Sequence, residues 1–187
     1  MSGFLVTLHP TAKKAIRAEV KGRMKSLSLT YINEMSSVVT SKLIEHPTYS
    51  LSKALCIYLS MAGEIQTYDI VQHAFDSGKR VFIPKVTGKN SADMFMLEVH
   101  SYSQIESFPK SSWGIPEPPI ELVKDSVDAT TLGIIDTVIV PGVAFDNSCG
   151  RIGHGKGYYG TCILPVQWCF KHLISIFVPT CTFNNMI

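Results

Sequence analysis

The chain has 187 residues and a mass of 20.6 kDa, the size of one domain that can bury a full hydrophobic core. Hydrophobic residues make up 45% of it and charged residues 17%, which excludes a disordered chain and indicates a folded globular one. The formal net charge is +2 and the cations are spread along the chain, so the sequence shows no basic stripe of the kind that binds nucleic acid.

Hydropathy and cysteine usage bear on the compartment. No apolar run reaches the roughly 18 residues that a membrane-spanning helix needs, and the opening MSGFLVTLHP lacks the basic start of a secretory signal. Five cysteines without a CxxC pair are typical of free thiols in a reducing compartment, so the cytoplasm is the expected location. The six histidines show no metal-ligand spacing.

Residues 11–26 predict an amphipathic helix that Thr11 can cap. Apolar residues at every fourth position form a narrow stripe for the core: Ala12, Ile16, Val20 and Met24. Basic side chains cover the rest of the helix, and a solvated surface is the plain interpretation of such a face. A second helix is predicted over residues 30–46, with Met35, Val38, Val39 and Ile44 toward the core.

Two predicted strands flank a predicted helix in the middle of the chain. Residues 54–61 form a continuous apolar run of strand length, and residues 79–86 form the next strand. Thr67 can cap a helix between them that ends at Gly78. This order predicts parallel strands joined by a right-handed crossover, with ligands bound beyond the carboxyl ends of the strands.

Glu64 lies in the short loop that follows the first of these strands. Its place at the carboxyl end of a parallel strand makes it a candidate ligand-binding residue. A loop glutamate without a role is the commoner case, and position alone does not decide between the two.

The next segments are predicted more coarsely. Strands are expected over residues 92–99 and 172–178. The loop of residues 107–119 is rich in proline and serine and carries Trp113, and a lone tryptophan near prolines most often anchors a loop by packing. Residues 120–135 are expected to form a surface connection.

The most informative stretch runs from Asp136 to Tyr159 and reads DTVIVPGVAFDNSCGRIGHGKGYY. It starts as a strand buried on both faces. Four glycines then alternate with cations: Gly150, Gly153, Gly155 and Gly157 with Arg151, His154 and Lys156. Glycines let backbone N–H groups approach an anion, and interleaved cations add charge. We interpret the stretch as a phosphate-holding loop that follows a buried strand.

Two familiar nucleotide-binding motifs nearly fit this loop. Residues 150–156 have the GxxxxGK spacing of a P-loop, but Gly157 stands where serine or threonine should follow. Residues 155–160 spell GxGxxG but do not directly follow the strand. A glycine-rich turn leading into a short helix is the alternative, and the alternation of cations with glycines favours the anion site.

PGVAFD followed by GRIGHGKGYY resembles the C-terminal signature of the 5-formyltetrahydrofolate cyclo-ligase family, also called methenyltetrahydrofolate synthetases. The resemblance covers residues 11–160 well and the remainder poorly. It implies an α/β fold with a mostly parallel central sheet flanked by helices in a Rossmann-like three-layer arrangement. Residues 1–187 would form a single domain, with residues 1–10 as a loose N-terminal extension.

The same resemblance implies the reaction. 5-Formyltetrahydrofolate and MgATP would give 5,10-methenyltetrahydrofolate, ADP and phosphate: ATP phosphorylates the formyl oxygen, and N10 of the folate then attacks the activated carbon. The protein would position the substrates and neutralise charge. ATP and Mg²⁺ are therefore the expected cofactors, and the expected partner is a folate, with or without a polyglutamate tail. A monomer without nucleic-acid or membrane partners is expected.

Site residues follow from the resemblance position by position. Lys156, Arg151 and Tyr158 are the expected catalytic residues. The nucleotide would contact the first helix and the glycine-rich loop through Lys13, Lys14, Arg17, Arg151, Ile152, Gly153, His154, Gly155, Lys156, Gly157, Tyr158 and Tyr159. The folate would contact Leu59, Glu64, Trp113, His154, Lys156, Tyr158 and Tyr159, with Glu64 accepting pterin N–H groups and Trp113 stacking on a ring. No side chain is expected to ligate metal.

Three departures from the family signature bear on activity. His154 stands where the family often has arginine, which keeps its charge at neutral pH. Gly160 stands where an acid would hold magnesium, and the final TCTFNNMI supplies no second acid. These departures leave open a family member that binds folate or nucleotide with little or no turnover. The glycine-rich loop alone would also permit a generic kinase-like enzyme.

Overall fold

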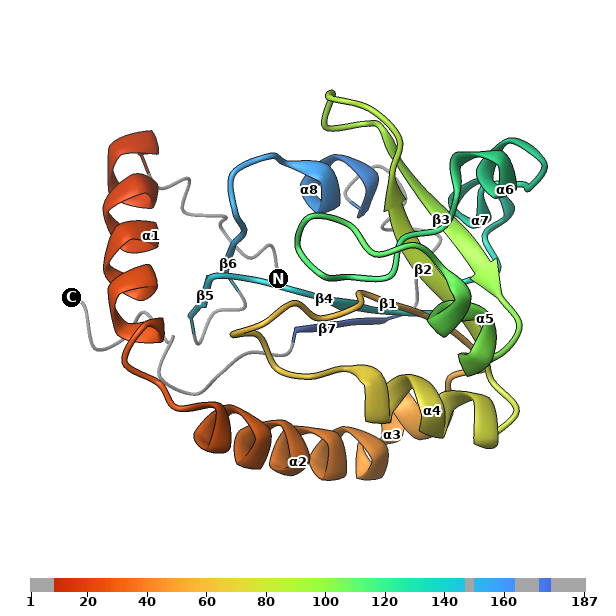
Figure 1. The fold of residues 1–187 in the computed structure, drawn as a ribbon, viewed down its shortest axis with the longest axis horizontal. Coiled ribbons are helices and arrows are strands. Elements are labelled where there is room, and N and C mark those ends of the chain that lie inside the picture. The colour runs from red at the N-terminus through yellow and green to blue at the C-terminus, as the bar shows by residue number, and fades with distance from the viewer. Residues whose placement is uncertain (1–8, 147–149, 164–171, 176–187) are drawn as a thin grey trace, which may run out of the picture.

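The computed structural model describes residues 9–146, 150–163 and 172–175. Figure 1 shows a central sheet with helices around it. The helices are α1 (Pro10–Met24), α2 (Leu29–Glu45), α3 (Pro47–Ser50), α4 (Tyr68–Asp76), α5 (Tyr102–Ser107), α6 (Ile120–Lys124), α7 (Ala129–Leu132) and α8 (Tyr158–Ile163). The strands are β1 (Ala54–Ile57), β2 (Arg80–Val86), β3 (Met94–Val99), β4 (Thr137–Val140), β5 (Ala144–Phe145), β6 (Arg151–Ile152) and β7 (His172–Ser175).

The central sheet has the strand order β3-β2-β1-β4-β7 and is mostly parallel. β1 pairs in parallel with both β2 and β4, and β4 pairs in parallel with β7. β3 runs antiparallel to β2, because the short loop of residues 87–93 can close a hairpin but cannot hold a crossover. The predicted α/β fold with a mostly parallel sheet is confirmed.

Both faces of the sheet are buried, which explains why its strands read as continuous apolar runs. Along β1, Leu55 and Ile57 face one hydrophobic cluster, while Ala54 and Cys56 face the other. Helices α2 to α5 contribute to the first cluster, and α7 packs in the second together with the partly buried tyrosines of α8. The sheet is thus the middle of three layers.

The first two helices differ in detail from the prediction. His9, not Thr11, caps α1, because the Nδ1 atom of His9 accepts the backbone N–H of Thr11 at 3.3 Å. In α2, Val38 is 44% exposed, whereas Ile32 and Leu43 are buried. The inward face of α2 is therefore rotated away from Val38. Residues 1–8 of the predicted N-terminal extension lie outside the described residues.

Strand β1 ends at Ile57, four residues earlier than predicted. The Thr67 side chain occupies the backbone groups beyond it: Thr67 Oγ1 donates to Tyr58 O at 2.8 Å and accepts from Ser60 N at 3.1 Å. The Ser60 hydroxyl in turn accepts from Thr67 N at 3.1 Å. This exchange replaces sheet pairing and fastens the start of α4 to the end of β1.

The expected surface connection over residues 120–135 is wrong in part, because it contains α6 and α7 and three buried residues, Val123, Ala129 and Ile135. Asp128 organises the second helix. Its Oδ1 atom accepts from Thr130 N at 3.0 Å, which caps α7, and from Met96 N at 3.1 Å, which binds the outer strand β3.

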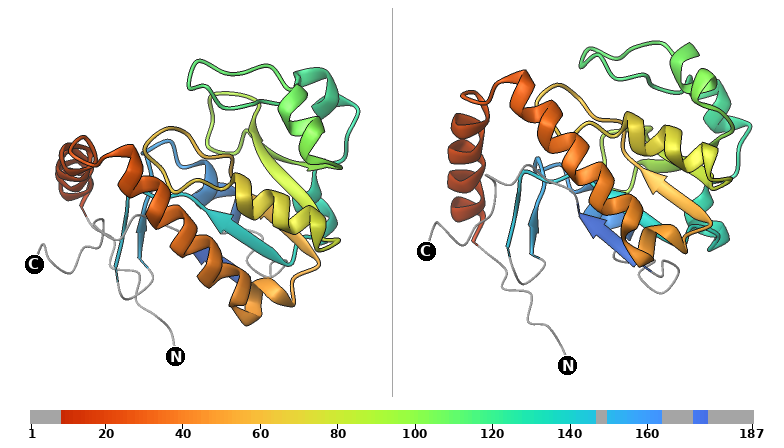
Figure 2. Two further views of the ribbon diagram at one scale, coloured as in Figure 1. Left: turned by 60° about the horizontal axis from the view of Figure 1, so that its bottom comes forward. Right: turned by 90° about the horizontal axis from the view of Figure 1, so that it is seen from below.

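Strands β5 and β6 form a small antiparallel hairpin that is separate from the central sheet. Figure 2 shows α1 standing beside this hairpin, and the α1 and β5 segments are in contact. The N-terminal helix therefore meets the beginning of the glycine-rich loop, although the two are far apart in the sequence.

Candidate active site

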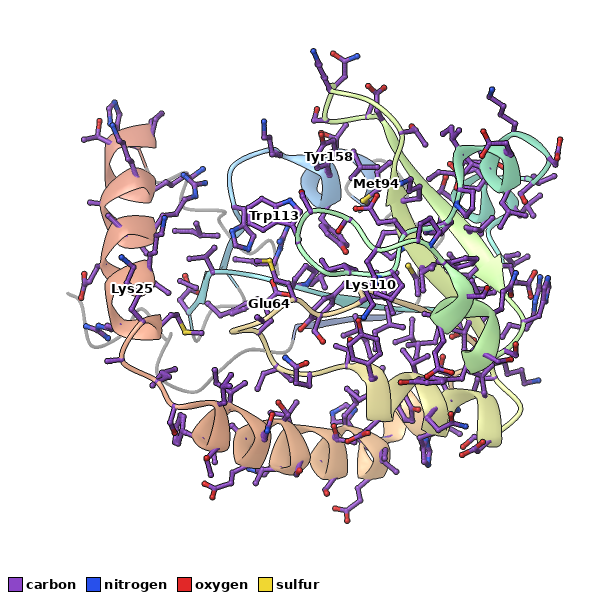
Figure 3. All side chains as sticks on the ribbon, in the orientation of Figure 1. Lys25, Glu64, Met94, Lys110, Trp113 and Tyr158 are labelled. Atoms are coloured by element: carbon purple, nitrogen blue, oxygen red, sulfur yellow. The ribbon has the colours of Figure 1, made fainter. Side chains whose placement is uncertain are left out.

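A cavity of about 250 Å³ opens beyond the carboxyl ends of β1, β2 and β4, where ligands of parallel sheets bind. Its apolar lining comprises Leu59, Met61, Pro84, Val86, Met94, Ile115, Pro116 and Pro141. Its polar lining comprises Tyr58, Glu64, Lys85, Glu117, His154, Tyr158 and Tyr159. Figure 3 labels Glu64, Met94 and Tyr158, which come from separate segments of the chain.

Glu64 enters the cavity from the loop after β1, as predicted from its position. The backbone N–H of Met61 donates to Glu64 Oε2 at 3.1 Å, so one carboxylate oxygen is already oriented. The Gln66 side chain fastens the same loop by donating to the carbonyls of Glu64 at 2.8 Å and Met61 at 3.3 Å. Glu64 Oε1 remains directed toward the Nε2 atom of His154, 3.7 Å away.

The glycine-rich loop starts at the β5–β6 hairpin. Asp146 Oδ1 accepts from Gly150 N at 2.7 Å, and a Cβ atom at Gly150 would lie 2.4 Å from the other carboxylate oxygen. Gly155 and Gly157 have φ angles of +106° and +82°, which side chains rarely adopt. The loop therefore requires glycine at these positions for two reasons, close approach at Gly150 and backbone conformation at the other two.

Arg17 is the predicted cation that the structure brings to this loop. Its Nε atom donates to Gly153 O at 2.8 Å, and its guanidinium also lies close to Gly155. Lys13 is partly exposed one turn earlier on α1, and Lys14 and Lys156 are exposed. The arrangement leaves lysine ammonium groups available at the surface around an arginine that is fixed by the loop backbone.

Arg151 occupies a more buried position than its neighbours in the loop. Its Nη1 atom donates to Pro141 O at 2.8 Å, and the guanidinium lies over the Tyr159 ring at 5.7 Å. Burial lowers the pKa of Arg151, an effect that Tyr159 opposes. These contacts place Arg151 where it joins the end of β4 to α8, and not on the exposed edge of the loop.

Two tyrosines of the cavity, Tyr58 and Tyr159, have pKa values raised above the usual range of a phenol. Burial raises the pKa of Tyr58 far above its usual range, with a smaller contribution from Glu64, and Tyr58 donates to Ile65 O at 3.3 Å. Burial is also the main cause that raises the pKa of Tyr159. Tyr158 donates to Gly88 O at 3.1 Å, which ties α8 to the loop between β2 and β3.

Leu59 and Trp113, two of the predicted folate contacts, differ in how deeply they are buried. Leu59 is buried and lines the cavity. Trp113 is 71% exposed and lies at the tip of its loop (Figure 3). Three residues that follow it, Ile115, Pro116 and Glu117, line the cavity instead. Trp113 is therefore near the cavity through its loop and is not packed as an anchor.

Sequence reasoning missed an ion pair in the cavity wall, in which Lys85 Nζ lies 2.5 Å from Glu117 Oε2. The signal for Lys85 was weak but present, since it stands at the carboxyl end of an apolar strand, as Glu64 follows another. Nothing in the sequence pairs it with Glu117. Met94, at the start of β3, was missed as well.

Two further observations concern metals and membranes. In residues 9–146, 150–163 and 172–175, no three or more histidine, cysteine or acidic residues are grouped so that they could hold a metal ion. None of the helices in these ranges is long and apolar enough to cross a membrane.

The position of the cavity and the chemistry beside it define a class. Parallel sheets bind small molecules beyond their strand ends, and a glycine loop flanked by cations holds anions. The chain is therefore an α/β protein suited to hold a small organic molecule next to an anionic group. A protein-family comparison is more specific, because residues 9–178 match the model of the 5-formyltetrahydrofolate cyclo-ligase family.

Individual relatives agree with this match. The 5-formyltetrahydrofolate cyclo-ligase of Mus musculus is 36% identical over 162 residues, which cover 87% of this chain and 77% of the relative. A probable 5-formyltetrahydrofolate cyclo-ligase of Caenorhabditis elegans is 38% identical over 153 residues, 80% of this chain and 73% of the relative. The chain belongs to the 5-formyltetrahydrofolate cyclo-ligase family, which confirms the resemblance of the glycine-rich signature.

Solved structures show the same fold. The NMR structure of 5,10-methenyltetrahydrofolate synthetase from Aquifex aeolicus matches with a TM-score of 0.69 at 25% identity, over 91% of this chain and 79% of the other. A 5,10-methenyltetrahydrofolate synthetase from Mycoplasma pneumoniae matches with a TM-score of 0.59 at 17% identity, over 81% and 77%.

Proposed function

We propose that this chain is an ATP-dependent 5-formyltetrahydrofolate cyclo-ligase that forms 5,10-methenyltetrahydrofolate with release of ADP and phosphate. The observation that carries the proposal is the family match over residues 9–178, which includes both the cavity residues and the glycine-rich loop. A generic kinase-like enzyme is disfavoured, because such an enzyme needs no folate cavity beside its phosphate loop.

The folate would occupy the cavity beyond the strand ends. Glu64 accepts N–H groups of the pterin, since Met61 N already orients its carboxylate. Leu59, Tyr158 and Tyr159 form apolar and aromatic walls. Trp113 stacks on the folate from the tip of its loop.

The nucleotide would be held between α1 and the glycine-rich loop. Arg17 is fixed by Gly153 O and keeps further guanidinium N–H groups for phosphate oxygens. Lys13 lies one turn away on the same helix face, and Lys14 and Lys156 add mobile charge from the surface. Backbone N–H groups at Gly155 and Gly157 complete an anion site.

Ring closure requires activation of the formyl group on N5, an amide-like carbon with a poor leaving group. Phosphoryl transfer from ATP to the formyl oxygen turns that oxygen into phosphate, which leaves as N10 of the folate attacks the carbon and loses its proton. Lys156 stabilises the phosphoryl group in transfer, and Arg151 and Tyr158 order the loop around it. The described residues offer no metal cluster, so magnesium would be held by ATP phosphates and water.

The test is an absorbance assay for the methenyl product with 5-formyltetrahydrofolate, ATP and magnesium. Wild-type protein is expected to form product, and Lys156→Ala to lose at least about tenfold in kcat/KM, which corresponds to about 1.4 kcal/mol. Lys21→Ala, an exposed lysine at the far end of α1, is the matched control and should keep its activity. Absence of product from folded wild-type protein at high magnesium would overturn the proposal.

A folate- or nucleotide-binding protein with little turnover is the second candidate. It is favoured by Gly160, which stands where the family signature has an acid. The space around Gly160 is open, because nothing lies within 4 Å of the place where a Cβ atom would be. Gly160→Asp should therefore fold normally, and gain of turnover in this variant would identify the missing acid as the cause.

Three further properties remain our proposals. We infer a monomer, a cytoplasmic location from the free-thiol pattern, and a folate substrate without nucleic-acid or membrane partners. One relative, from Arabidopsis thaliana, is described as mitochondrial. Size-exclusion chromatography and localisation of a tagged chain test the first two.

A further inference from the structure

The loop of residues 109–117, here called the Trp113 loop, is a small rigid unit. Ser111 N donates to Ile115 O at 2.8 Å, and Glu117 N donates to Pro109 O at 2.9 Å. A tight turn at Gly114, with a φ angle of +75°, closes the tip. Because these hydrogen bonds cross the loop along its length, the loop moves as one body. If its base rotates relative to the sheet, Trp113 at its tip moves with it.

Among the residues that the structure describes, one ion pair joins the base of this loop to the central sheet. Lys85 projects from β2, where it is opposite Phe95 of β3, and its Nζ atom contacts Glu117 Oε2 at 2.5 Å. The Lys85 side chain is only 15% exposed. The Glu117 side chain is 43% exposed, so the pair is shielded from water on the lysine side and is partly screened by salt on the carboxylate side.

The ion pair also stands in the wall of the folate cavity. Lys85 and Glu117 line the cavity together with Ile115 and Pro116 of the same loop. Ile115 packs against the core, whereas the side chain of Trp113 is mostly exposed to solvent. The position of the tip thus depends on the attachment at the base.

We propose that the Lys85–Glu117 ion pair is the joint that fixes the angle of the Trp113 loop over the cavity, and that both are positioning residues for the folate substrate. This inference rests on the proposed cyclo-ligase function for its substrate. Direct binding of a substrate anion by Lys85 is a different role, which the experiment below separates from it.

The experiment compares Lys85→Met, Glu117→Gln, the double variant of both, and the charge swap Lys85→Glu with Glu117→Lys. Either single variant should raise KM for 5-formyltetrahydrofolate about tenfold, which corresponds to about 1.4 kcal/mol, and leave KM for ATP within about twofold. The double variant should be no worse than the singles, because both remove the same link. The swap should recover most of the loss.

A second readout needs no ligand. The chain has two tryptophans, so a Trp168→Phe background leaves Trp113 as the fluorophore. In the free protein, the fluorescence anisotropy of Trp113 should fall in both single variants and return in the swap. This measurement tests the joint even if wild-type protein forms no methenyl product, and in that case the folate Kd replaces KM.

The matched control is the ion pair of Arg80 and Glu98, which joins the other ends of β2 and β3 with two contacts of 2.7 Å. Arg80→Met and Glu98→Gln should change neither the folate KM nor the anisotropy. The inference is overturned if the swap fails to restore folate binding, if KM for ATP rises equally, or if the anisotropy is unchanged. Failure of the swap with normal anisotropy would assign Lys85 to direct binding of the substrate.

Discussion

Arg17 differs from the lysines of the proposed nucleotide site, because the backbone of the glycine-rich loop already fixes its guanidinium group. One guanidinium nitrogen donates to Gly153 O and so joins α1 to the glycine-rich loop, across 136 positions of sequence. The planar group keeps donors for a phosphate at the same time, whereas a lysine ammonium would have to choose between the two. A substitution that preserves the charge should therefore not preserve the site.

The first prediction follows from this geometry. Arg17→Lys should raise KM for ATP about tenfold, about 1.4 kcal/mol, while KM for 5-formyltetrahydrofolate changes by less than about threefold. Steady-state kinetics with each substrate varied in turn measures both. Lys21→Arg on the same helix is the control, and an Arg17→Lys enzyme with unchanged ATP affinity would contradict the assigned role.

Tyr49 makes the stability of the protein depend on pH in the alkaline range. It is fully buried, its hydroxyl contacts His73 Nδ1 at 2.9 Å, and burial raises the pKa of Tyr49 to about 12 from an ordinary value of 10.0. Below pH 10 both the folded and the unfolded chain keep the phenol proton. Between pH 10 and 12 the unfolded chain loses it first, so rising pH favours unfolding.

The second prediction is that Tyr49 contributes about 1.4 kcal/mol per pH unit to the loss of unfolding free energy above pH 10. Denaturant titrations of wild type and Tyr49→Phe between pH 9 and 11 measure the two slopes, and the variant should have the smaller one. Tyr31→Phe, at a partly exposed position on α2, is the control. Equal slopes for wild type and Tyr49→Phe would show that the folded-state pKa is not raised.

At the scale of elements, the glycine-rich loop depends on backbone conformation more than on space. A Cβ atom at Gly155 would meet the Arg17 guanidinium at an ordinary distance of 3.6 Å, but the φ angle of +106° is strained for any side chain. Gly160, in α8, has neither constraint. Substitution by alanine should therefore be harmful at Gly155 and harmless at Gly160.

The third prediction uses that contrast. Gly155→Ala should strain the loop by about 1–3 kcal/mol, which reduces kcat/KM about tenfold or more and lowers the melting temperature of the domain by roughly 2–12 °C. Gly160→Ala should leave activity intact and stabilise α8 slightly. Full activity of Gly155→Ala would mean that the loop does not work in the conformation described.

Sequence reasoning identified the strands of the central sheet and the glycine-rich loop, but not the β5–β6 hairpin or the features that distant contacts create. The run that starts at Ala54 predicts a strand correctly, yet the end of that strand depends on Thr67 Oγ1, which lies just before α4. The short α7 depends on Asp128, a cap that a closer inspection of the sequence could have found. The pairing of Lys85 with Glu117 joins a strand to a loop 32 residues later, and no periodicity encodes it.

At the scale of the whole molecule, a few sequence patterns were enough to predict the fold. A sheet that is buried on both faces requires continuous apolar strands and a layer of helices on each side. Continuous apolar runs separated by an amphipathic helix specify a parallel sheet with a helix layer on its face, and the alternation of Leu55 and Cys56 between two cores is the result. The alternation of glycines with cations after β4 predicted an anion-holding loop, and the family signature agrees with that prediction. The cavity was predicted in its place beyond the strands, but its lining by the Trp113 loop required the structure.

The fourth prediction concerns association between molecules. β3 is the outer strand of the sheet, and Asp128 occupies the N–H of Met96. Asp128→Ala should free this N–H, weaken the cap of α7, and raise aggregation on mild heating. Light scattering of wild type and variant at equal concentration measures it, with Asp125→Ala as control. An Asp128→Ala protein that stays monodisperse would show that the edge needs no such cover.

During synthesis, the outer strand β3 is made before the residue that covers its edge. Met96 leaves the ribosome 32 residues ahead of Asp128. At translation speeds of ~5–20 residues per second, the nascent outer strand waits roughly 2 to 6 seconds before its cover is made. In that interval the edge of the apolar MFMLEV segment is uncovered, so it can pair with other nascent chains on the same mRNA. Chaperone demand during synthesis should therefore peak before α7 emerges.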